Sequence, residues 1–213
     1  GSFVVESRDG HSMADHPVVE VSWYGAVAFC NWLSEDQGLT PCYDLDSWER
    51  TTPVPNGYRL PTEAEWERAA AWDAGSSKHW VYGFQSDNIS KNRCNYEDSG
   101  YANPLNLTSY PYTTPIGYYD GSSGTTDSPS YVGCYDMSGN VEDWCHDWYS
   151  SSHYEGGAQT DPPGPSSGTY RVCRGGSWKS LAQYCRSADR DGKGPIDSNH
   201  YIGFRLARTP SSD

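Results

Sequence analysis

Basic residues are scarce in this sequence. Lys and Arg number 15 against 28 Asp and Glu, which gives a formal net charge of -13 at pH 7. Proteins that bind nucleic acid need basic patches to contact the phosphate backbone, so we expect no nucleic-acid partner. The chain also lacks a run of about 20 apolar residues, so we expect no transmembrane helix. No signal peptide is visible, and we expect membrane attachment only through a lipid anchor outside this sequence.

Cysteines are few and irregularly spaced. They lack the C-x-x-C spacing of a zinc site, and at this chain length they do not make a dense disulfide framework. Because their number, seven, is odd, at least one thiol is free or pairs with another chain. We expect buried or incidental thiols, with room for one or two bridges, among Cys30, Cys42, Cys94, Cys134, Cys145, Cys173 and Cys185.

Aromatic residues and glycine are abundant. Although only 35% of residues are hydrophobic, the 17 Tyr and 9 Trp bury enough area each to build a core. The 22 Gly and 14 Pro indicate a loop-rich fold. No linker divides the chain, so we predict one domain over residues 17–208. A loose polar segment, 1–16, precedes it and begins with Gly1-Ser2, typical of an expression scar; a short tail, 209–213, follows.

Two helices are predicted from their caps. Ser22 precedes the first, over residues 23–35, which places Trp23, Val27, Cys30 and Leu33 on one face and ends before Gly38. Thr62 and Glu65 form a T-x-x-E capping box at the start of the second, whose inward side chains are predicted to be Trp66, Ala69 and Ala70.

Short strands and long loops are predicted for the rest of the chain. The β-branched segment 17–21 is a strand candidate, and 171–178 and 202–207 resemble strands. Residues 73–130 show few periodic signals and are expected to form long ordered loops. The fold class is therefore predicted to be α+β.

A polar insert, residues 179–201, separates the last two predicted strands. It is too polar to be core and too long to be a turn. Loops longer than about 12–15 residues in a compact domain are usually functional or disordered. Because strand-like sequence holds this one at both ends, we predict that it is functional.

Four motifs occur in one order along the chain. They are V-S-W-x-x-A-V-A-F-C-x-W over 21–32, Y-R-L-P-T-E-A-E-W-E over 58–67, Y-D-M-S-G-N-V-x-x-W over 135–144, and R-G-G-S-W with I-G-F-R-L-A over 174–207. This set resembles the formylglycine-generating-enzyme (sulfatase-modifying factor) family. The resemblance implies a variant of the C-type lectin fold, with two helices, short antiparallel sheets and many long ordered loops.

The resemblance extends only in part to the enzyme's chemistry. The founding enzymes bind copper with two cysteines five residues apart after the GGSW motif, and soft thiolates suit Cu(I). Those positions hold Ser180 and Cys185 here, and the cysteine of the final motif is replaced by Leu206. Another branch binds iron through three histidines, but the six histidines here are not spaced as such a set, and we expect each at the surface: His11, His16, His79, His146, His153 and His200. A metal-dependent oxidase or sulfoxide synthase is therefore the alternative; we expect no catalytic residue and no required cofactor.

The final motif resembles a narrower group, the variable proteins of diversity-generating retroelements, of the Treponema type. In that group, Asn codons in a template repeat are copied with errors, and the products exclude Glu, Gln, Met and Trp. Residues of the permitted types alternate with frame residues such as Ala182 and Cys185 in the insert. We call the following twelve the predicted variable residues: Ser180, Leu181, Tyr184, Asp189, Asp191, Gly192, Gly194, Ile196, Asp197, Asn199, His200 and Tyr201.

The composition of these residues suits binding. Tyr supplies stiff contact area, and small polar residues supply adaptable hydrogen bonds, as in antibody paratopes. We predict a receptor-type ligand-binding protein, secreted or displayed at the cell surface as an outer-membrane lipoprotein, whose partner is a protein or another macromolecule. Two alternatives without a ligand-binding function stay open: the insert is a solvated acidic loop without a partner, or the chain is a structural domain of a larger surface protein.

A calcium-binding segment of the family resembles residues 136–143. By resemblance, a structural calcium ion would receive carboxylates from Asp136 and Asp143 and carbonyl oxygens from Gly139 and Val141, which are the hard ligands that Ca²⁺ prefers. The alternative is that Asp136 caps the Ser138-Gly139 turn and Asp143 faces water.

Overall fold

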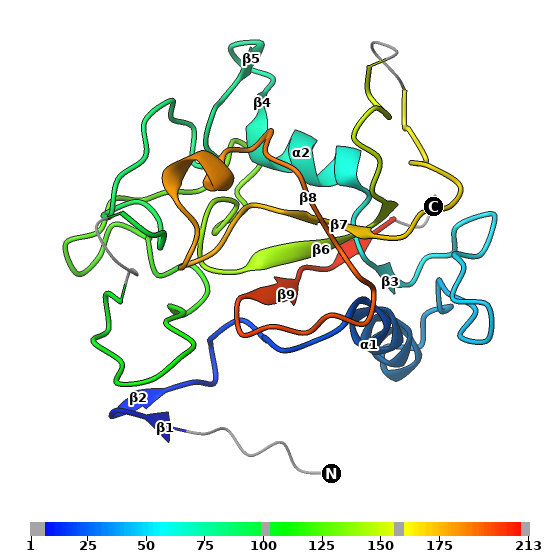
Figure 1. Cartoon of the computed structure of the whole chain (residues 1–213), viewed down its shortest axis with the longest axis horizontal. Coiled ribbons are helices and arrows are strands. Elements are labelled where there is room, and N and C mark those ends of the chain that lie inside the picture. The colour runs from blue at the N-terminus through cyan, green and yellow to red at the C-terminus, as the bar shows by residue number, and fades with distance from the viewer. Residues whose placement is uncertain (1–6, 99–102, 156–159, 210–213) are drawn as a thin grey trace.

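The computed structural model describes residues 7–98, 103–155 and 160–209. It contains two α-helices, α1 (Trp23–Asp36) and α2 (Glu63–Ala71), and one 3-10 helix, η1 (Ala182–Cys185). The strands are β1 (Ser7–Arg8), β2 (His11–Ser12), β3 (Tyr58–Arg59), β4 (Trp72–Asp73), β5 (Lys78–His79), β6 (Glu142–Trp148), β7 (Arg171–Arg174), β8 (Asp191–Lys193), β9 (Ile202–Phe204) and β10 (Ala207–Arg208). Long loops join these short elements, and the α+β prediction is confirmed (Figure 1).

A four-stranded sheet in the order β8-β7-β6-β9 forms the centre of the molecule. β6 and β7 pair antiparallel, as do β7 and β8, whereas β6 and β9 pair parallel. The predicted short antiparallel sheets are confirmed, and the pairing of β6 with β9 is a parallel addition to them. The parallel pairing is possible because the chain returns to β9 through a long connection rather than a hairpin.

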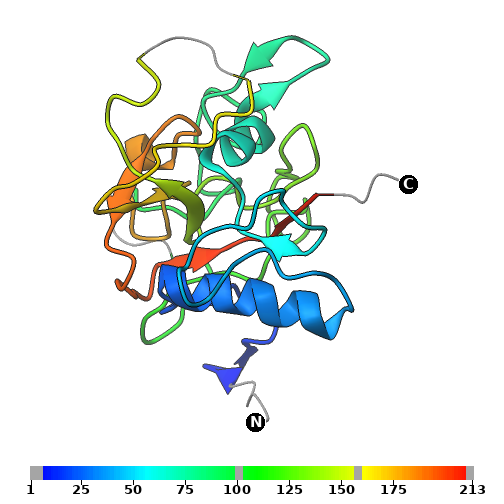
Figure 2. The same ribbon diagram turned by 90° about the vertical axis from the view of Figure 1, so that its right-hand side faces the viewer.

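The two helices lie on opposite sides of this sheet (Figures 1 and 2). Successive side chains of a strand point to opposite faces. Trp144 and Cys173 accordingly pack in the core cluster that includes α1, while Cys145 and Val172 pack in the cluster that includes α2. The sheet is thus a middle layer buried on both faces, which explains why β7 has no exposed residue.

Both helix caps are as predicted. The Ser22 hydroxyl accepts from the Gly25 N–H, and Thr62 and Glu65 form the reciprocal capping box. Leu33, predicted on the buried face of α1, is half-buried, and Ala26 takes a core position instead. No helix in the described ranges has the length and apolar composition needed to cross a bilayer.

The segment 17–21 is not a strand, which corrects the expectation from its β-branched residues. Glu20 adopts a positive φ of 58°, which breaks the extended conformation. The segment is held by single hydrogen bonds instead: the Glu20 N–H donates to the Asn199 carbonyl, and the Trp144 indole donates to the Val21 carbonyl.

The described part of the N-terminal segment, 7–16, is not loose. β1 and β2 form a hairpin, and the Asp9 carboxylate accepts hydrogen bonds from the backbone and the hydroxyl of Thr108. Arg8 donates to the Pro111 carbonyl, and a His16 ring nitrogen lies 2.8 Å from the Thr113 hydroxyl. Segment 7–16 is therefore ordered by tertiary contacts with the loop 108–113, although its polar composition predicts a loose segment. Residues 1–6 and the tail residues 210–213 lie outside the described residues.

Candidate ligand-binding site

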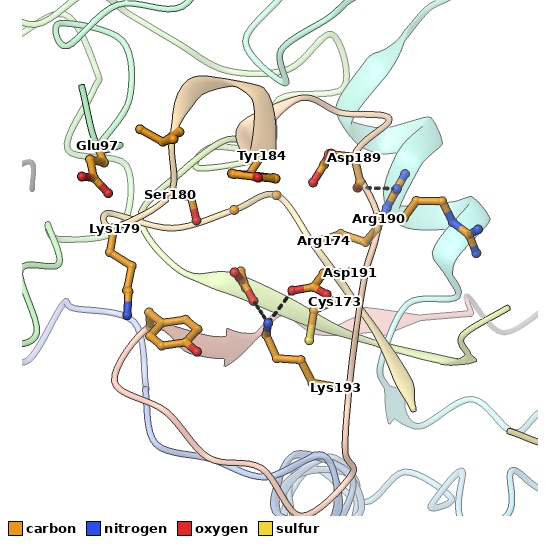
Figure 3. A pocket seen from close by; sticks show the side chains of 15 residues that line it. Glu97, Cys173, Arg174, Lys179, Ser180, Tyr184, Asp189, Arg190, Asp191 and Lys193 are labelled. Atoms are coloured by element: carbon orange, nitrogen blue, oxygen red, sulfur yellow. Dashed lines mark hydrogen bonds and ion pairs between the residues drawn. The ribbon is translucent and has the colours of Figure 1, made fainter. Parts of the chain in front are cut away.

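The insert and strands β6 and β7 line an open pocket of about 490 Å³ (Figure 3). η1 forms one wall, β7 and its Gly175-Gly176 pair form the floor, and β8 forms the opposite wall. Half of the predicted variable residues line this pocket, namely Ser180, Leu181, Tyr184, Asp189, Asp191 and Tyr201. Segments spaced along 23 residues of sequence, 179–201, thus face one cavity.

The insert is a braced structure rather than a free loop. Its last section adds β8 to the central sheet, with Gly192 opposite Val172. The Ser138 hydroxyl donates to the Cys185 carbonyl at 2.7 Å, and the Glu97 N–H donates to the Ser180 carbonyl at 2.8 Å. Main-chain positions in the insert are therefore set by contacts that do not depend on the exposed side chains.

Arg174 secures the floor of the pocket from below. Its side chain is fully buried, and it donates to the carbonyls of Ser187 at 2.8 Å and Asp189 at 2.6 Å. It also pairs with Glu67 on α2 and lies 3.6 Å from Glu63. A buried guanidinium needs such partners, because an unpaired buried charge is strongly destabilising. The insert is consequently tied to α2 through one side chain.

A lysine held between two carboxylates forms the charged part of the pocket (Figure 3). The Lys193 ammonium lies 3.1 Å from a Glu142 carboxylate oxygen and 2.5 Å from one of Asp191. Burial alone would lower the pKa of Lys193, but the two carboxylates raise it overall, so the ammonium stays charged. Burial raises the pKa of Glu142 to about 7, although Lys193 opposes that shift.

A second lysine lies over an aromatic ring at the same pocket. The Lys179 ammonium is 4.6 Å from the centre of the Tyr201 ring, and that of Lys193 is 5.7 Å from it. Charged residues that do not belong to the predicted variable residues also line the pocket, among them Glu142, Arg174, Lys179 and Lys193. Glu142 stands in β6 beside other acidic and polar residues (E-D-W-C-H-D-W), so its charge alone does not distinguish it in the sequence.

The other six predicted variable residues do not line the pocket. Ile196 is 78% exposed, and the Asp197 carboxylate caps the Gly194 N–H at 2.9 Å. The His200 ring stacks on Tyr110, with ring centres 5.3 Å apart, and also on Trp178. The remaining members of this half are Gly192, Gly194 and Asn199. None of the twelve is a buried residue. A variable position must lie outside the core, and all twelve meet this condition.

Both carboxylates of the predicted calcium segment already accept hydrogen bonds within the protein. The Asp143 carboxylate accepts from Arg205 at 2.6 Å and from the Trp66 indole at 2.9 Å, and the Asp136 carboxylate accepts from the Gly117 N–H. Arg205 also donates to the Tyr135 and Asp136 carbonyls. A guanidinium thus already pairs with one of the two carboxylates that the resemblance assigns to calcium. Gly139 and Val141 lie in the same segment, and the calcium site stays a prediction.

The positions that the resemblance assigns to the enzyme's copper ligands hold Ser180 and Cys185, and the Cys185 sulfur lies 3.9 Å from the Ser180 carbonyl oxygen. Cys185 is fully buried and does not line the pocket, and burial raises the pKa of its thiol to about 12. Ser180 does line the pocket, and Leu206 lines another cavity. Within the described ranges, no group of three His, Cys, Asp or Glu side chains is placed to hold a metal ion. His146 is not a surface residue: its ring packs against Trp23 and Tyr43.

Comparisons with known proteins agree with this architecture. A formylglycine-generating enzyme of Thermomonospora curvata is 32% identical, over 94% of this chain and 59% of the enzyme. A serine/threonine-protein kinase pkn1 of Chlamydia pneumoniae is 36% identical, over 92% of this chain and 24% of the kinase. The chain therefore spans less than two thirds of the length of these curated relatives. The solved structure of Treponema denticola variable protein 1 superposes with a TM-score of 0.72 and 32% identity, covering 98% of this chain and 77% of that one.

The family assignment rests on most of the chain. The sulfatase-modifying factor enzyme 1-like domain matches residues 3–210, a range that includes all four sequence motifs. The resemblance to the formylglycine-generating-enzyme family and its variant of the C-type lectin fold is confirmed. The chain belongs to the sulfatase-modifying factor enzyme 1-like domain family.

Proposed function

We propose that this protein is a ligand-binding scaffold whose insert, residues 179–201, carries a diversified binding site. The observation that carries the proposal is the pocket itself: six of the twelve predicted variable residues face one cavity of about 490 Å³. The similarity to Treponema denticola variable protein 1 supports the same function.

In the insert, main-chain atoms hold the fold, whereas exposed side chains are free to change. Leu181 and Tyr184 are 43% and 50% exposed, so other side chains at these positions would contact solvent or ligand rather than the core. The braces that hold the backbone, such as Arg174 to the Asp189 carbonyl, act on main-chain oxygens. Replacing the Asp189 side chain leaves that brace in place. Such a division lets the contact surface change while the scaffold stays folded.

The ligand of this site would be a protein or another macromolecule, and the protein would act at the cell surface or after secretion, as an outer-membrane lipoprotein. The support is chemical: the pocket mixes Tyr, Ser, Leu and Asp with two lysines, which suits polar protein surfaces. The net charge of -13 makes nucleic acid an unsuitable partner.

The alternative function is a metal-dependent oxidase or sulfoxide synthase, and the formylglycine-generating relatives favour it. The geometry favours the binding protein, because the remaining cysteine, Cys185, is buried with a pKa of about 12 and so is a thiol at neutral pH. The thiolate is the form that binds a metal or attacks a substrate.

Sequencing the encoding locus in several isolates tests the proposed function. Substitutions should concentrate in the codons of the twelve predicted variable residues, beside a near-repeat that carries Asn codons at those positions. The codons of Arg174, Glu142 and Cys185 should stay unchanged, because Arg174 braces the insert, Glu142 pairs with Lys193 and Cys185 is buried in the core. An insert that is identical in all isolates, without any nearby repeat, would overturn the diversified site.

An activity assay tests the alternative directly. The purified chain would be incubated with Cu(I), oxygen, a thiol reductant and a cysteine-containing peptide, and the peptide mass would be followed. We expect no loss of the peptide thiol beyond that in a control with Cys185→Ser. Copper-dependent conversion of the peptide that the Cys185→Ser variant lacks would establish an enzyme.

A further inference from the structure

A second cavity, far from the insert in sequence, lies at the start of α2. It measures about 580 Å³ and is lined by the loop that carries Arg50, by Arg59 of β3, by the first turns of α2 and by residues 160–163. In Figure 1 the loop 40–57 and the segment 160–168 lie to the right of α2. None of the residues that line it takes part in the proposed ligand-binding pocket.

Three arginines converge on this cavity, namely Arg50, Arg59 and Arg68. Arg59 is held by a two-point pair with Glu65, at 2.6 and 2.7 Å. Arg50 and Arg68 make no side-chain hydrogen bond or ion pair with any residue that the structure describes. Two guanidinium groups are therefore available to a ligand, and a guanidinium binds phosphate through paired N–H donors.

Three other arginines differ from these two, because Arg174, Arg190 and Arg205 each lie beside a buried carboxylate. Two carboxylates also line the second cavity, but Glu65 is taken by Arg59, and Asp161 makes no ion pair with a described residue. The lining thus carries a net charge of about +1 in a chain whose net charge is -13.

The first turn of α2 adds a backbone donor to the cavity. The Glu63 N–H donates to Asp147, and the Glu65 N–H donates to the Thr62 hydroxyl. The N–H of Ala64, which lines the cavity, has no hydrogen-bond partner among the described residues. Free N–H groups at a helix N-terminus and the partial positive charge there bind anions.

The positive field also acts on a neighbouring group. His146 lies behind β3, and its pKa is lowered to about 3, first by burial and then by the charges of Arg50, Arg171 and Arg59. The imidazole is therefore neutral at neutral pH and adds no charge beside the arginines.

We propose that this cavity binds a phosphate group, free or as a monoester, between the guanidinium groups of Arg50 and Arg68 and the Ala64 N–H. The proposal is independent of the function of the insert, since the two cavities share no residue.

Calorimetry at constant ionic strength tests the proposal, with inorganic phosphate and phenyl phosphate as probes and chloride as the baseline. We expect saturable binding to the wild-type chain and, in a labelled sample, a shift of the Ala64 amide resonance. Binding of both probes would show that the group alone suffices; binding of phenyl phosphate alone would indicate a monoester. Absence of binding of either probe would overturn the proposal.

Charge-matched variants locate the binding. Arg50→Gln with Arg68→Gln should weaken phosphate binding about 100-fold, because each lost charge-assisted hydrogen bond contributes about a factor of ten. Lys91→Gln with Arg93→Gln removes the same charge elsewhere and should weaken it less than about threefold. Equal weakening in both double variants would mean that only the overall charge matters, and the site would be wrong. Neither Arg50 nor Arg68 holds the fold, and circular dichroism melting checks that.

Discussion

Cys185 shows how the environment of one residue changes its chemistry. By resemblance it stands at the position of a catalytic thiol, but here it packs in a core cluster with Tyr82, Phe84 and Cys94. Burial favours the neutral thiol over the thiolate, which raises the pKa to about 12. Cys185 therefore acts as an apolar residue beneath the pocket rather than as a reactive group within it.

Thiol labelling measures this difference. We expect Ellman's reagent at about pH 8 to leave Cys185 unmodified in the folded protein and to modify it at once in denaturant, since the thiolate is the reactive form. Mass spectrometry of the digested, labelled chain identifies the residue. The half-exposed Cys134 provides an internal comparison and should be labelled first. Rapid native labelling at Cys185 would return the enzyme alternative to consideration.

β8 shows how an element limits which positions can vary. Gly192 is one of the predicted variable residues, and it belongs to an edge strand paired with β7. A Cβ atom built there would lie 2.8 Å from the Tyr149 ring. The strand backbone and the tyrosine leave little room for a Cβ atom, so Gly192 is expected to vary less than the other eleven predicted variable residues although its codon type permits substitution.

Two glycine variants in the same segment test this constraint. Gly192→Ala should lower the free energy of unfolding by about 1–3 kcal/mol, the usual cost of overpacking. Gly194→Ala is the matched control: its Cβ would approach only the exposed Asp197 carboxylate, at 3.2 Å, which can move aside. Urea denaturation of both variants gives the comparison. Equal stability of Gly192→Ala and Gly194→Ala would show that the Tyr149 ring moves to accommodate the methyl group. Gly192 would then be free to vary.

The whole molecule combines a large negative charge with buried acids. Asp147 is almost fully buried, and one of its carboxylate oxygens has no hydrogen-bond partner among the described residues. Burial raises its pKa from 3.8 to about 7. Because the folded protein then binds this proton more tightly than the unfolded chain, the group stabilises the fold fully below about pH 4. That stabilisation is lost as the pH rises to about 7.

Replacing this carboxyl by an amide should remove the pH dependence. We expect the unfolding free energy of Asp147→Asn, relative to wild type, to increase between about pH 4 and pH 7.5 by up to about 4 kcal/mol. The amide oxygen can still accept from the Glu63 N–H. Asp46→Asn, at an exposed position, serves as the control and should follow the wild-type curve. If the unfolding free energies of wild type and Asp147→Asn changed with pH in the same way, the pKa of Asp147 would not be raised in the folded protein.

Local signals in the sequence determined the helices, the family and the surface position of the insert. Ser22, Thr62 and Glu65 specify caps through hydrogen bonds within one helical turn, so adjacent residues suffice to predict them. None of the twelve predicted variable residues is buried, which agrees with their polar surroundings in the chain.

The tertiary structure alone decided which of those residues share a cavity and which partners surround them. Six of the twelve meet at the pocket because β8 joins β7 and η1 closes over Gly176, contacts that no spacing in the sequence encodes. Glu20 leaves the extended conformation that its neighbours favour, since Asn199 binds its N–H from a distant segment. Arg205 likewise takes the carboxylate that resemblance assigned to calcium. Burial and charge pairing depend on residues far apart in the chain, and for that reason only the folded molecule decides them.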